Sequence, residues 1–274
     1  MLNLRFTLLA ISLCGLFACK QKQASEIHDD FKKYYDQFNV EGSFVLFDPQ
    51  ANKYIFYNQD QFKQNFSPAS TFKICNSLIG LETGIIKDEN FVIPWDSVIR
   101  NPIWDHDHDL KTAFKNSTVW YYQELARRVG GQQMKYWIDK ANYGNTDTSG
   151  GIDQFWLTGG LRVSPEQQID FLRRFRDNKL PFSQHSVDIV KNIMITKDTL
   201  NYIIRGKTGW GGHGDKDVGW YVGYIETKSQ VYYFSNCVQI DSKVLNDVNR
   251  AILFDNSRIE IAYKILEELK LINE

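Results

Sequence analysis

The chain has 274 residues, of which 43% are hydrophobic and 14% aromatic, enough to bury a sizeable core in one or two subdomains. Its formal net charge is −1, and it contains no long basic run. The composition therefore gives no electrostatic basis for a nucleic-acid partner or for attraction to an anionic membrane surface.

Residues 1–19 have the pattern of a signal peptide. Arg5 precedes an apolar run that is too short for a transmembrane helix. Residues 16–19 resemble a bacterial lipobox, which predicts cleavage before Cys19 and lipidation of its thiol; ordinary secretion is the alternative, because Phe17 is bulky for that position. Both alternatives place the mature protein outside the cytoplasm, either in the periplasm or anchored to a membrane by a lipid. The polar residues 20–40 are predicted to be a tether.

Strand patterns occupy both ends of the remaining chain, at residues 41–48, 53–58, 202–206, 218–226 and 230–238. Residues 68–192 are mainly helical; the helix over 165–177, for example, is opened by Ser164 with Pro165 at its first position. A last amphipathic helix carries Ile259, Ala262, Ile265, Leu266, Leu269 and Ile272. This order predicts a mixed α/β fold over residues 41–274. An antiparallel sheet built from both termini (41–66 and 196–274) is flanked by helices, and a mainly helical part (67–195) is inserted in it. A site at their junction is expected.

Residues 70–73, Ser-Thr-Phe-Lys, place a hydroxyl and an amine one turn apart at the start of an apolar helix. Ser70 would be a nucleophile and Lys73 its base, without a histidine. The plain alternatives are an N-cap serine and a solvated lysine. Because the run over 72–81 is largely apolar, we predict a buried helix, on which a lysine is unusual unless it is paired or functional.

A second motif, Lys207-Thr208-Gly209, lies far downstream, just before a predicted strand. It offers a cation, a hydroxyl and a glycine backbone that a substrate can approach closely. Each motif alone is modest evidence, since Ser-x-x-Lys is expected by chance about once in a chain of this length. Together they suit acyl transfer through a serine ester.

Other candidates are ambiguous by themselves. Ser117 begins a predicted helix, where it is either a cap or a proton relay between Ser70 and Lys207. Tyr143, in Tyr-Gly-Asn, follows a predicted helix and indicates a helix-ending turn. Trp156 is either plain core or a donor, since a buried indole N–H needs a partner.

The remaining patterns in the sequence do not indicate a functional site. Residues 105–109, Asp-His-Asp-His-Asp, alternate potential metal ligands, but no matching distant ligand set exists, so we predict no metal. No Ser-His-Asp triad is apparent. Cys75 and Cys237, the two cysteines beyond the signal segment, are expected to be buried thiols rather than a disulfide framework.

Taken together, the chain resembles the class D β-lactamase (oxacillinase) family of penicillin-recognising serine enzymes. The matching motifs stand in the family's order and spacing at residues 70–73, 117–119, 143–145, 155–157 and 207–210. Framework stretches also match, and Arg258 leads the last helix as it does in the family. The resemblance runs from about residue 41 to the C-terminus and implies a β-lactamase/transpeptidase-like fold.

The resemblance implies a hydrolase that opens the β-lactam amide of penicillin-type antibiotics through an acyl-enzyme and so confers resistance. Ser70 would be the nucleophile, and Lys73, carboxylated by CO₂ or bicarbonate, the general base of both acylation and deacylation, with no other cofactor. Trp156 would hold the carboxylated lysine, and Ser117 and Lys207 would protonate the leaving nitrogen. The residues implied to bind the substrate are Trp104, Val119, Tyr143, Thr208, Gly209, Trp210 and Arg258.

Two other functions fit part of the pattern. A β-lactam sensor domain shares the fold and is acylated, but barely deacylates. A cell-wall transpeptidase or carboxypeptidase shares the two short motifs, yet is not expected to have the Trp156 context. Turnover distinguishes all three functions. The sequence predicts small-molecule β-lactams as partners and no particular oligomeric state.

Overall fold

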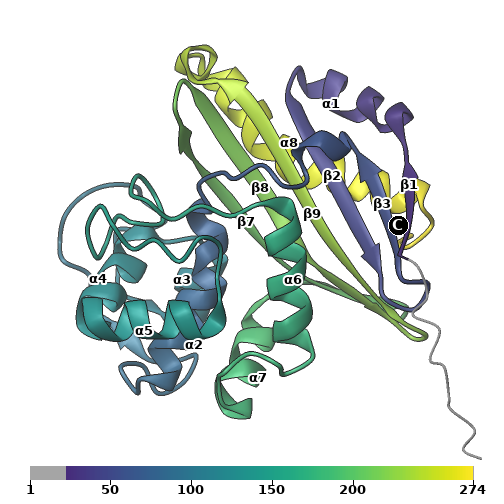
Figure 1. The fold of residues 1–274 in the computed structure, drawn as a ribbon. Coiled ribbons are helices and arrows are strands. Elements are labelled where there is room, and N and C mark those ends of the chain that lie inside the picture. Colours follow the sequence, from purple (N-terminus) through teal and green to yellow (C-terminus); the bar gives the residue numbers. More distant parts are fainter. Residues whose placement is uncertain (1–22, 274) are drawn as a thin grey trace, which may run out of the picture.

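A computed structural model describes residues 23–273, so the predicted signal peptide and Cys19 lie outside the described residues. The fold is built on a seven-stranded sheet in the order β1-β3-β2-β9-β8-β7-β6 (Figure 1). The strands are β1 (Ala24–Ile27), β2 (Glu41–Asp48), β3 (Lys53–Tyr57), β6 (Ile195–Asp198), β7 (Tyr202–His213), β8 (Lys216–Thr227) and β9 (Val231–Asp241). All neighbours pair antiparallel except β1 with β3. The pairing of β2 with β9 joins the two ends of the chain, as the sequence predicts.

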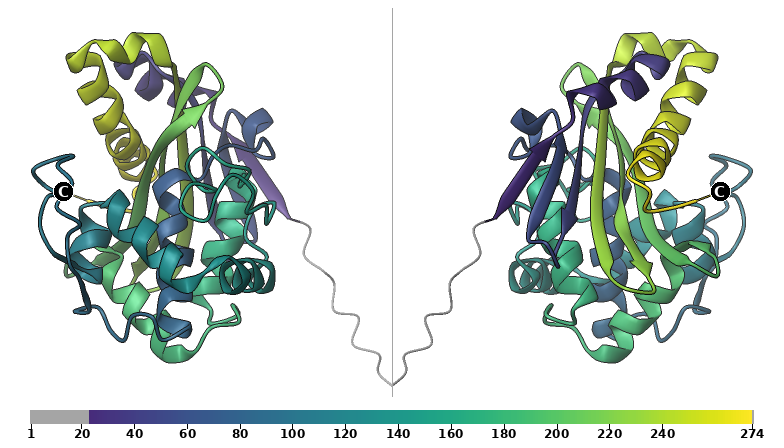
Figure 2. Two further views of the ribbon diagram at one scale, coloured as in Figure 1. Left: turned by 90° about the vertical axis from the view of Figure 1, so that its left-hand side faces the viewer. Right: turned by 90° about the vertical axis from the view of Figure 1, so that its right-hand side faces the viewer.

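Both faces of the sheet are buried, because its central strands are apolar at successive positions. Along β2, Val45 and Phe47 pack into the core on the side of the inserted helices, whereas Phe44 and Leu46 pack into a second core on the opposite face. Trp220 and Tyr221 of β8 divide in the same way. The sheet is therefore the middle layer between two sets of helices (Figure 2).

The inserted part confirms the mainly helical prediction. It contains α2 (Lys73–Glu82), α3 (Leu110–Lys115), α4 (Val119–Val129), α5 (Gly131–Ala141), α6 (Pro165–Arg176), α7 (Gln184–Ile193) and the two-residue strands β4 (Val92–Ile93) and β5 (His108–Asp109). Ser164 caps α6 in a capping box with Gln167, and Pro165 occupies the first turn. Cys75 and Cys237 are free thiols and both are buried.

The opposite face is covered by α1 (Lys32–Phe38) and α8 (Val248–Glu268), which lie side by side in Figure 2. Residues 24–38 thus form β1 and α1 where the sequence predicts a tether. Most residues of this stretch are polar, but Phe31 and Tyr35 are buried in the second core and hold the stretch against the sheet. In α8, Ile259 is exposed rather than apolar core, because the buried stripe runs through Phe254, Arg258, Ile261 and Ile265.

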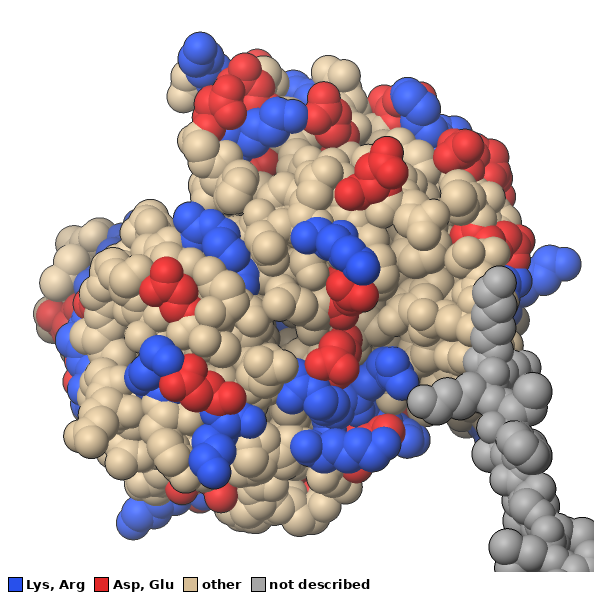
Figure 3. All heavy atoms as spheres, in the orientation of Figure 1, with Lys and Arg blue, Asp and Glu red and all other residues tan. Residues whose placement is uncertain are grey.

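Acidic and basic side chains lie interspersed over the face seen in Figure 3. Across residues 23–273, no helix is long and apolar enough to cross a membrane, and no group of three His, Cys, Asp or Glu side chains could hold a metal ion. The Asp-His-Asp-His-Asp segment instead makes local contacts. Asp109 caps α3 by accepting from the Thr112 N–H, and Asp107 accepts from the Trp95 N–H.

Candidate active site

Ser70 and Lys73 meet where a short 3-10 turn (Ala69–Phe72) runs into α2. The Lys73 amine donates to the Ser70 hydroxyl at 2.6 Å, and both residues are buried, Lys73 completely. Ala69, just before the serine, has a left-handed φ of 45°, an unfavourable conformation for a residue with a Cβ. Such a conformation at the point where the serine enters the helix is typical of residues held in place for function.

The pocket around Lys73 favours a neutral amine. Complete burial lowers the pKa of Lys73 to about 7, because an apolar surrounding disfavours the charged form. Trp156 is also fully buried, with its ring 5.5 Å from that of Phe72, the neighbour of Lys73. The Trp156 indole N–H has no hydrogen-bond partner among residues 23–273. A buried, unpaired donor is costly, so this N–H indicates room for an acceptor that the side chains do not supply.

The Lys-Thr-Gly motif lies inside β7 rather than before a strand, since β7 continues to His213. It packs directly on the Ser70 turn. A Cβ at Gly209 would lie 3.0 Å from the Pro68 carbonyl oxygen and 3.1 Å from the Thr71 side chain, so glycine permits this close approach. The junction of sheet and helical part is therefore where the two motifs meet.

Lys207 links this strand to the loop between α3 and α4. Its ammonium donates to the Ser117 hydroxyl at 3.0 Å and to the Thr208 carbonyl at 3.0 Å. Ser117 has a left-handed φ of 55° and does not cap α4, which begins at Val119. Burial, together with the charges of Lys73 and Arg258, lowers the pKa of Lys207 well below its ordinary value.

A cavity of about 520 Å³ opens over these residues. Its wall includes eight residues that are predicted from the sequence: Ser70, Trp104, Ser117, Val119, Thr208, Gly209, Trp210 and Arg258. Lys73 and Trp156 are buried behind it. Tyr143, only 1% exposed, is not brought to the cavity; its ring packs against Phe72 and Phe171. Its place is therefore in the core behind the site rather than in the substrate pocket.

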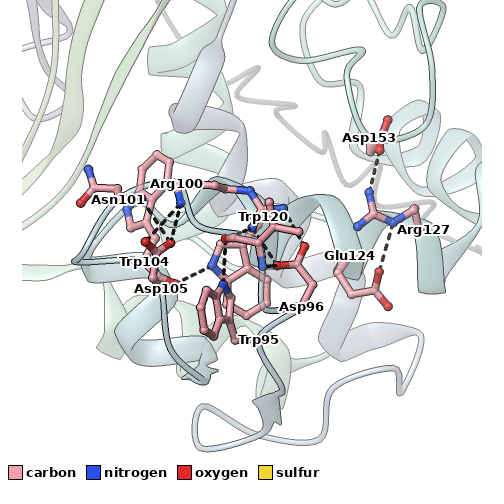
Figure 4. Close-up of polar contacts among 11 residues, drawn as sticks. Trp95, Asp96, Arg100, Asn101, Trp104, Asp105, Trp120, Glu124, Arg127 and Asp153 are labelled. Atoms are coloured by element: carbon pink, nitrogen blue, oxygen red, sulfur yellow. Dashed lines mark hydrogen bonds and ion pairs between the residues drawn. The ribbon is translucent and has the colours of Figure 1, made fainter.

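The Trp104 wall is fixed by a polar network, which Figure 4 shows. Asp105 accepts from the backbone N–H groups of Arg100 and Asn101, closing the loop on itself. The indole of Trp120 donates to the Trp104 carbonyl at 2.7 Å, and the Trp104 indole donates to the Asn116 carbonyl at 3.0 Å. A second link in Figure 4, from Arg127 of α4 to Asp153 at 2.6 Å, holds the loop that leads to Trp156.

Arg258 reaches the cavity from α8, on the opposite face of the sheet. Its stem passes over Gly219, where a Cβ would lie 2.8 Å from Arg258 Cδ, so glycine makes room for it. The guanidinium donates to the Gly209 carbonyl at 3.0 Å and pairs with Asp255. Asp255 is not among the residues predicted from the sequence, although its spacing three residues before Arg258 on a helix is a usable signal for an ion pair.

Lys73, Lys207 and Arg258 together form a buried group of basic side chains. Burial lowers the pKa of all three from their ordinary values. Like charges this close raise the free energy of the folded state unless anions compensate them. Asp255 already compensates Arg258, so the arrangement favours additional negative charge chiefly near Lys73 and Lys207.

Residues 42–253 match the family described as penicillin binding protein transpeptidase domain. The β-lactamase OXA-48 of Klebsiella pneumoniae is 39% identical over 236 residues, covering 85% of this chain and 88% of that protein. The crystal structure of the class D β-lactamase YbXI from Nostoc is 40% identical, has a TM-score of 0.81 and is matched over 88% of this chain and 99% of that one.

The C-terminal domain of the Bacillus licheniformis penicillin receptor BlaR is also similar. It is 31% identical, with a TM-score of 0.83, over 92% of this chain and 99% of that one. The β-lactamases share more sequence with the chain than the receptor domain does, and the match spans nearly the whole described fold. The chain belongs to the class D β-lactamases, within the penicillin-binding transpeptidase family.

Proposed function

We propose that this protein is a serine β-lactamase, which hydrolyses the β-lactam amide of penicillin-type antibiotics through an acyl-enzyme on Ser70. The observation that carries the proposal is the buried pair of Ser70 and Lys73, 2.6 Å apart, together with the Trp156 indole N–H, which has no hydrogen-bond partner among residues 23–273. This pair supplies a nucleophile and a base in a site that excludes water from the amine.

In acylation, the Ser70 oxygen attacks the β-lactam carbonyl carbon as its proton leaves toward Lys73. The backbone N–H groups of Ser70 and Trp210 are proposed to stabilise the oxyanion. The direction of the Trp210 N–H supports this assignment. The Gly206 N–H donates to the Met194 carbonyl, away from β8, and strand alternation puts the Trp210 N–H on the same edge, beyond the end of β6.

Opening of the ring requires a proton for the leaving nitrogen. Ser117 lines the cavity, and its hydrogen bond from Lys207 places an ammonium directly behind this hydroxyl. We assign the delivery of this proton to Ser117, with Lys207 replacing it. Thr208 and Arg258 are assigned to the carboxylate of the antibiotic, which a guanidinium binds well because the two planar groups match.

Deacylation needs a base that stays close to Ser70 and is ionised. Carboxylated on its amine by CO₂, Lys73 would supply an anionic oxygen for this purpose. The residues present fit such a group. The lowered pKa of Lys73, about 7, gives the neutral amine that reacts with CO₂, and the Trp156 N–H is a donor that has no acceptor in the part of the chain that the structure describes. Trp156 would hold the group, and Phe72 would keep its surroundings apolar.

We also propose export through the signal segment, with Cys19 as the site of lipid attachment and the membrane-anchored or periplasmic protein as the mature form. Protection of bacteria from penicillins follows if the enzyme is exported. Expression of the full chain with a labelled fatty acid tests the anchor. Label in the parent and none in Cys19→Ser supports it, and a soluble unlabelled product supports ordinary secretion.

The test of the function is a steady-state hydrolysis assay with penicillins, oxacillin and a carbapenem in bicarbonate buffer. Many substrate molecules cleaved per protein, and none by Ser70→Ala, would support the β-lactamase. One molecule bound per protein without turnover would support a sensor-type binding domain, the second candidate that the similarity to the BlaR domain favours.

A further inference from the structure

Asp255 stands one helical turn before Arg258 on α8, and both line the cavity with Thr208. Its carboxylate pairs with Arg258 Nη2. The Asp255 side chain is 50% exposed, whereas that of Arg258 is 9% exposed. The partner of the guanidinium is thus a carboxylate at the cavity surface, where the carboxylate of an antibiotic is proposed to bind.

The orientation of the Arg258 side chain does not depend on the Asp255 carboxylate. Its Nη1 donates to the Gly209 carbonyl at 3.0 Å, and its Nε donates to the backbone carbonyl of Asp255 at 2.9 Å. Its guanidinium also lies 5.7 Å from the centre of the Trp210 ring. These three contacts involve backbone or ring atoms and would remain if Asp255 lost its charge.

The charge of Asp255 acts against a second anion at the same place. Among the described residues that line the cavity, Asp255 is the only acidic one, beside the cations Lys115 and Arg258. A substrate carboxylate that approaches Arg258 therefore meets a guanidinium already neutralised by a neighbouring carboxylate. Two carboxylates on one guanidinium repel each other, and the repulsion is weakened but not removed by partial exposure.

We propose that Asp255 is a specificity-determining residue that weakens the binding of carboxylate-bearing β-lactams by competing for Arg258. In the free protein, the same carboxylate compensates a buried guanidinium, so it favours the folded state at the expense of substrate affinity. This inference rests on the proposed β-lactamase function, because that function places the antibiotic's carboxylate at Arg258.

The test measures the second-order rate constant for acylation by a fluorescent penicillin, together with kcat and KM for benzylpenicillin, in Asp255→Asn and the parent. Asparagine keeps the shape and removes the charge. We expect acylation about two- to tenfold faster at low salt, KM lower by a similar factor and kcat unchanged, because the repulsion acts on binding alone. High salt should reduce the difference.

Two matched variants complete the design. Glu260→Gln removes the same charge from an exposed position of α8 that does not line the cavity, and it should behave like the parent. Asp255→Glu keeps the charge and should also behave like the parent. Asp255→Ala serves as a second neutral variant if Asp255→Asn does not fold.

The outcomes separate the two proposals. If the neutral variants acylate no faster than the parent, or have a raised KM, Asp255 does not compete for Arg258 and the inference is wrong, whatever the turnover. If the parent is acylated without turnover, the hydrolase proposal fails, while the acylation rates still decide the role of Asp255. Equal acceleration in Glu260→Gln would show an effect of net charge only and would also contradict the inference.

Discussion

The ammonium of Lys207 donates to the Ser117 hydroxyl at 3.0 Å, and this bond joins the sheet to the inserted helical part behind the cavity wall that Ser117 lines. Each residue comes from a different part of the chain, and neither is placed by its local sequence alone. Ser117 is held with left-handed backbone, and Lys207 is held on an apolar strand beside other cations. The site thus depends on how the two parts meet.

Removal of Lys207 should weaken both binding and acylation. Lys207→Ala takes away the cation behind Ser117 and part of the positive potential that attracts the substrate carboxylate, so we expect kcat/KM to fall by about 100-fold or more. The measurement is the rate of acylation over a range of penicillin concentrations. Lys228→Ala, in the exposed turn between β8 and β9, is the control. An unchanged rate in Lys207→Ala would exclude the proposed proton path.

Arg258 is proposed to bind the carboxylate of the substrate, which is distant from the bond that breaks. Arg258→Ala should therefore raise KM by about tenfold or more with a smaller change in kcat. Steady-state kinetics with benzylpenicillin measure both constants, and circular dichroism checks that the variant folds. A strong loss of kcat at unchanged KM would show that Arg258 does not bind the carboxylate.

Activity should depend on pH through Lys73. Its pKa is about 7, so the amine is increasingly protonated as the pH falls below this value, and a protonated amine cannot take up CO₂. We expect activity to fall on acidification and to recover on addition of bicarbonate near neutral pH. If, after removal of CO₂, the activity were the same with and without added bicarbonate, carboxylation of Lys73 would be contradicted.

The free energy of unfolding should also depend on pH through Lys73. In CO₂-free buffer the unfolded chain binds a proton at Lys73 up to the ordinary lysine pKa of 10.5, but the folded chain only up to about 7. The unfolded state thus binds more protons between these values, and the free energy of unfolding falls as the pH is lowered through this window. Lys73→Met should be more stable than the parent at pH 7, by on the order of 4 kcal/mol. Denaturant titration measures this, and equal stability at pH 7 would contradict the burial argument.

Trp156 should hold the carboxylated lysine through its indole N–H. Trp156→Phe keeps an apolar ring and removes only the donor, so the carbon-13 signal of the carbamate, after labelled bicarbonate is added, should be weaker than in the parent. Trp220→Phe is a matched control, because the buried Trp220 indole already donates to the Ser67 carbonyl at 2.9 Å. An equally strong signal in Trp156→Phe would assign Trp156 to the core alone.

The sequence predicts the parts of this protein whose patterns are local. The apolar strands at both ends and the Ser70 helix can be recognised from the sequence, because their buried faces require apolar residues at regular spacings. It misses β1 and α1, since their stability comes from Phe31 and Tyr35 in a distant core. It also misplaces Tyr143 and overlooks Asp255, because a side chain's direction into a cavity depends on tertiary packing. The motifs identify most of the residues of the site, but the contacts between these residues follow only from the tertiary structure.

The mass of the intact protein after a brief exposure to benzylpenicillin, followed over time in bicarbonate buffer, shows whether Ser70 forms an acyl-enzyme that is then hydrolysed. We expect that an adduct of one penicillin appears on the parent and disappears as the protein returns to its original mass, ready for another cycle. Ser70→Ala should form no adduct. A parent that stays acylated throughout would contradict the claim that the buried Ser70 and Lys73 pair supports hydrolysis, and would identify the protein as a binding domain.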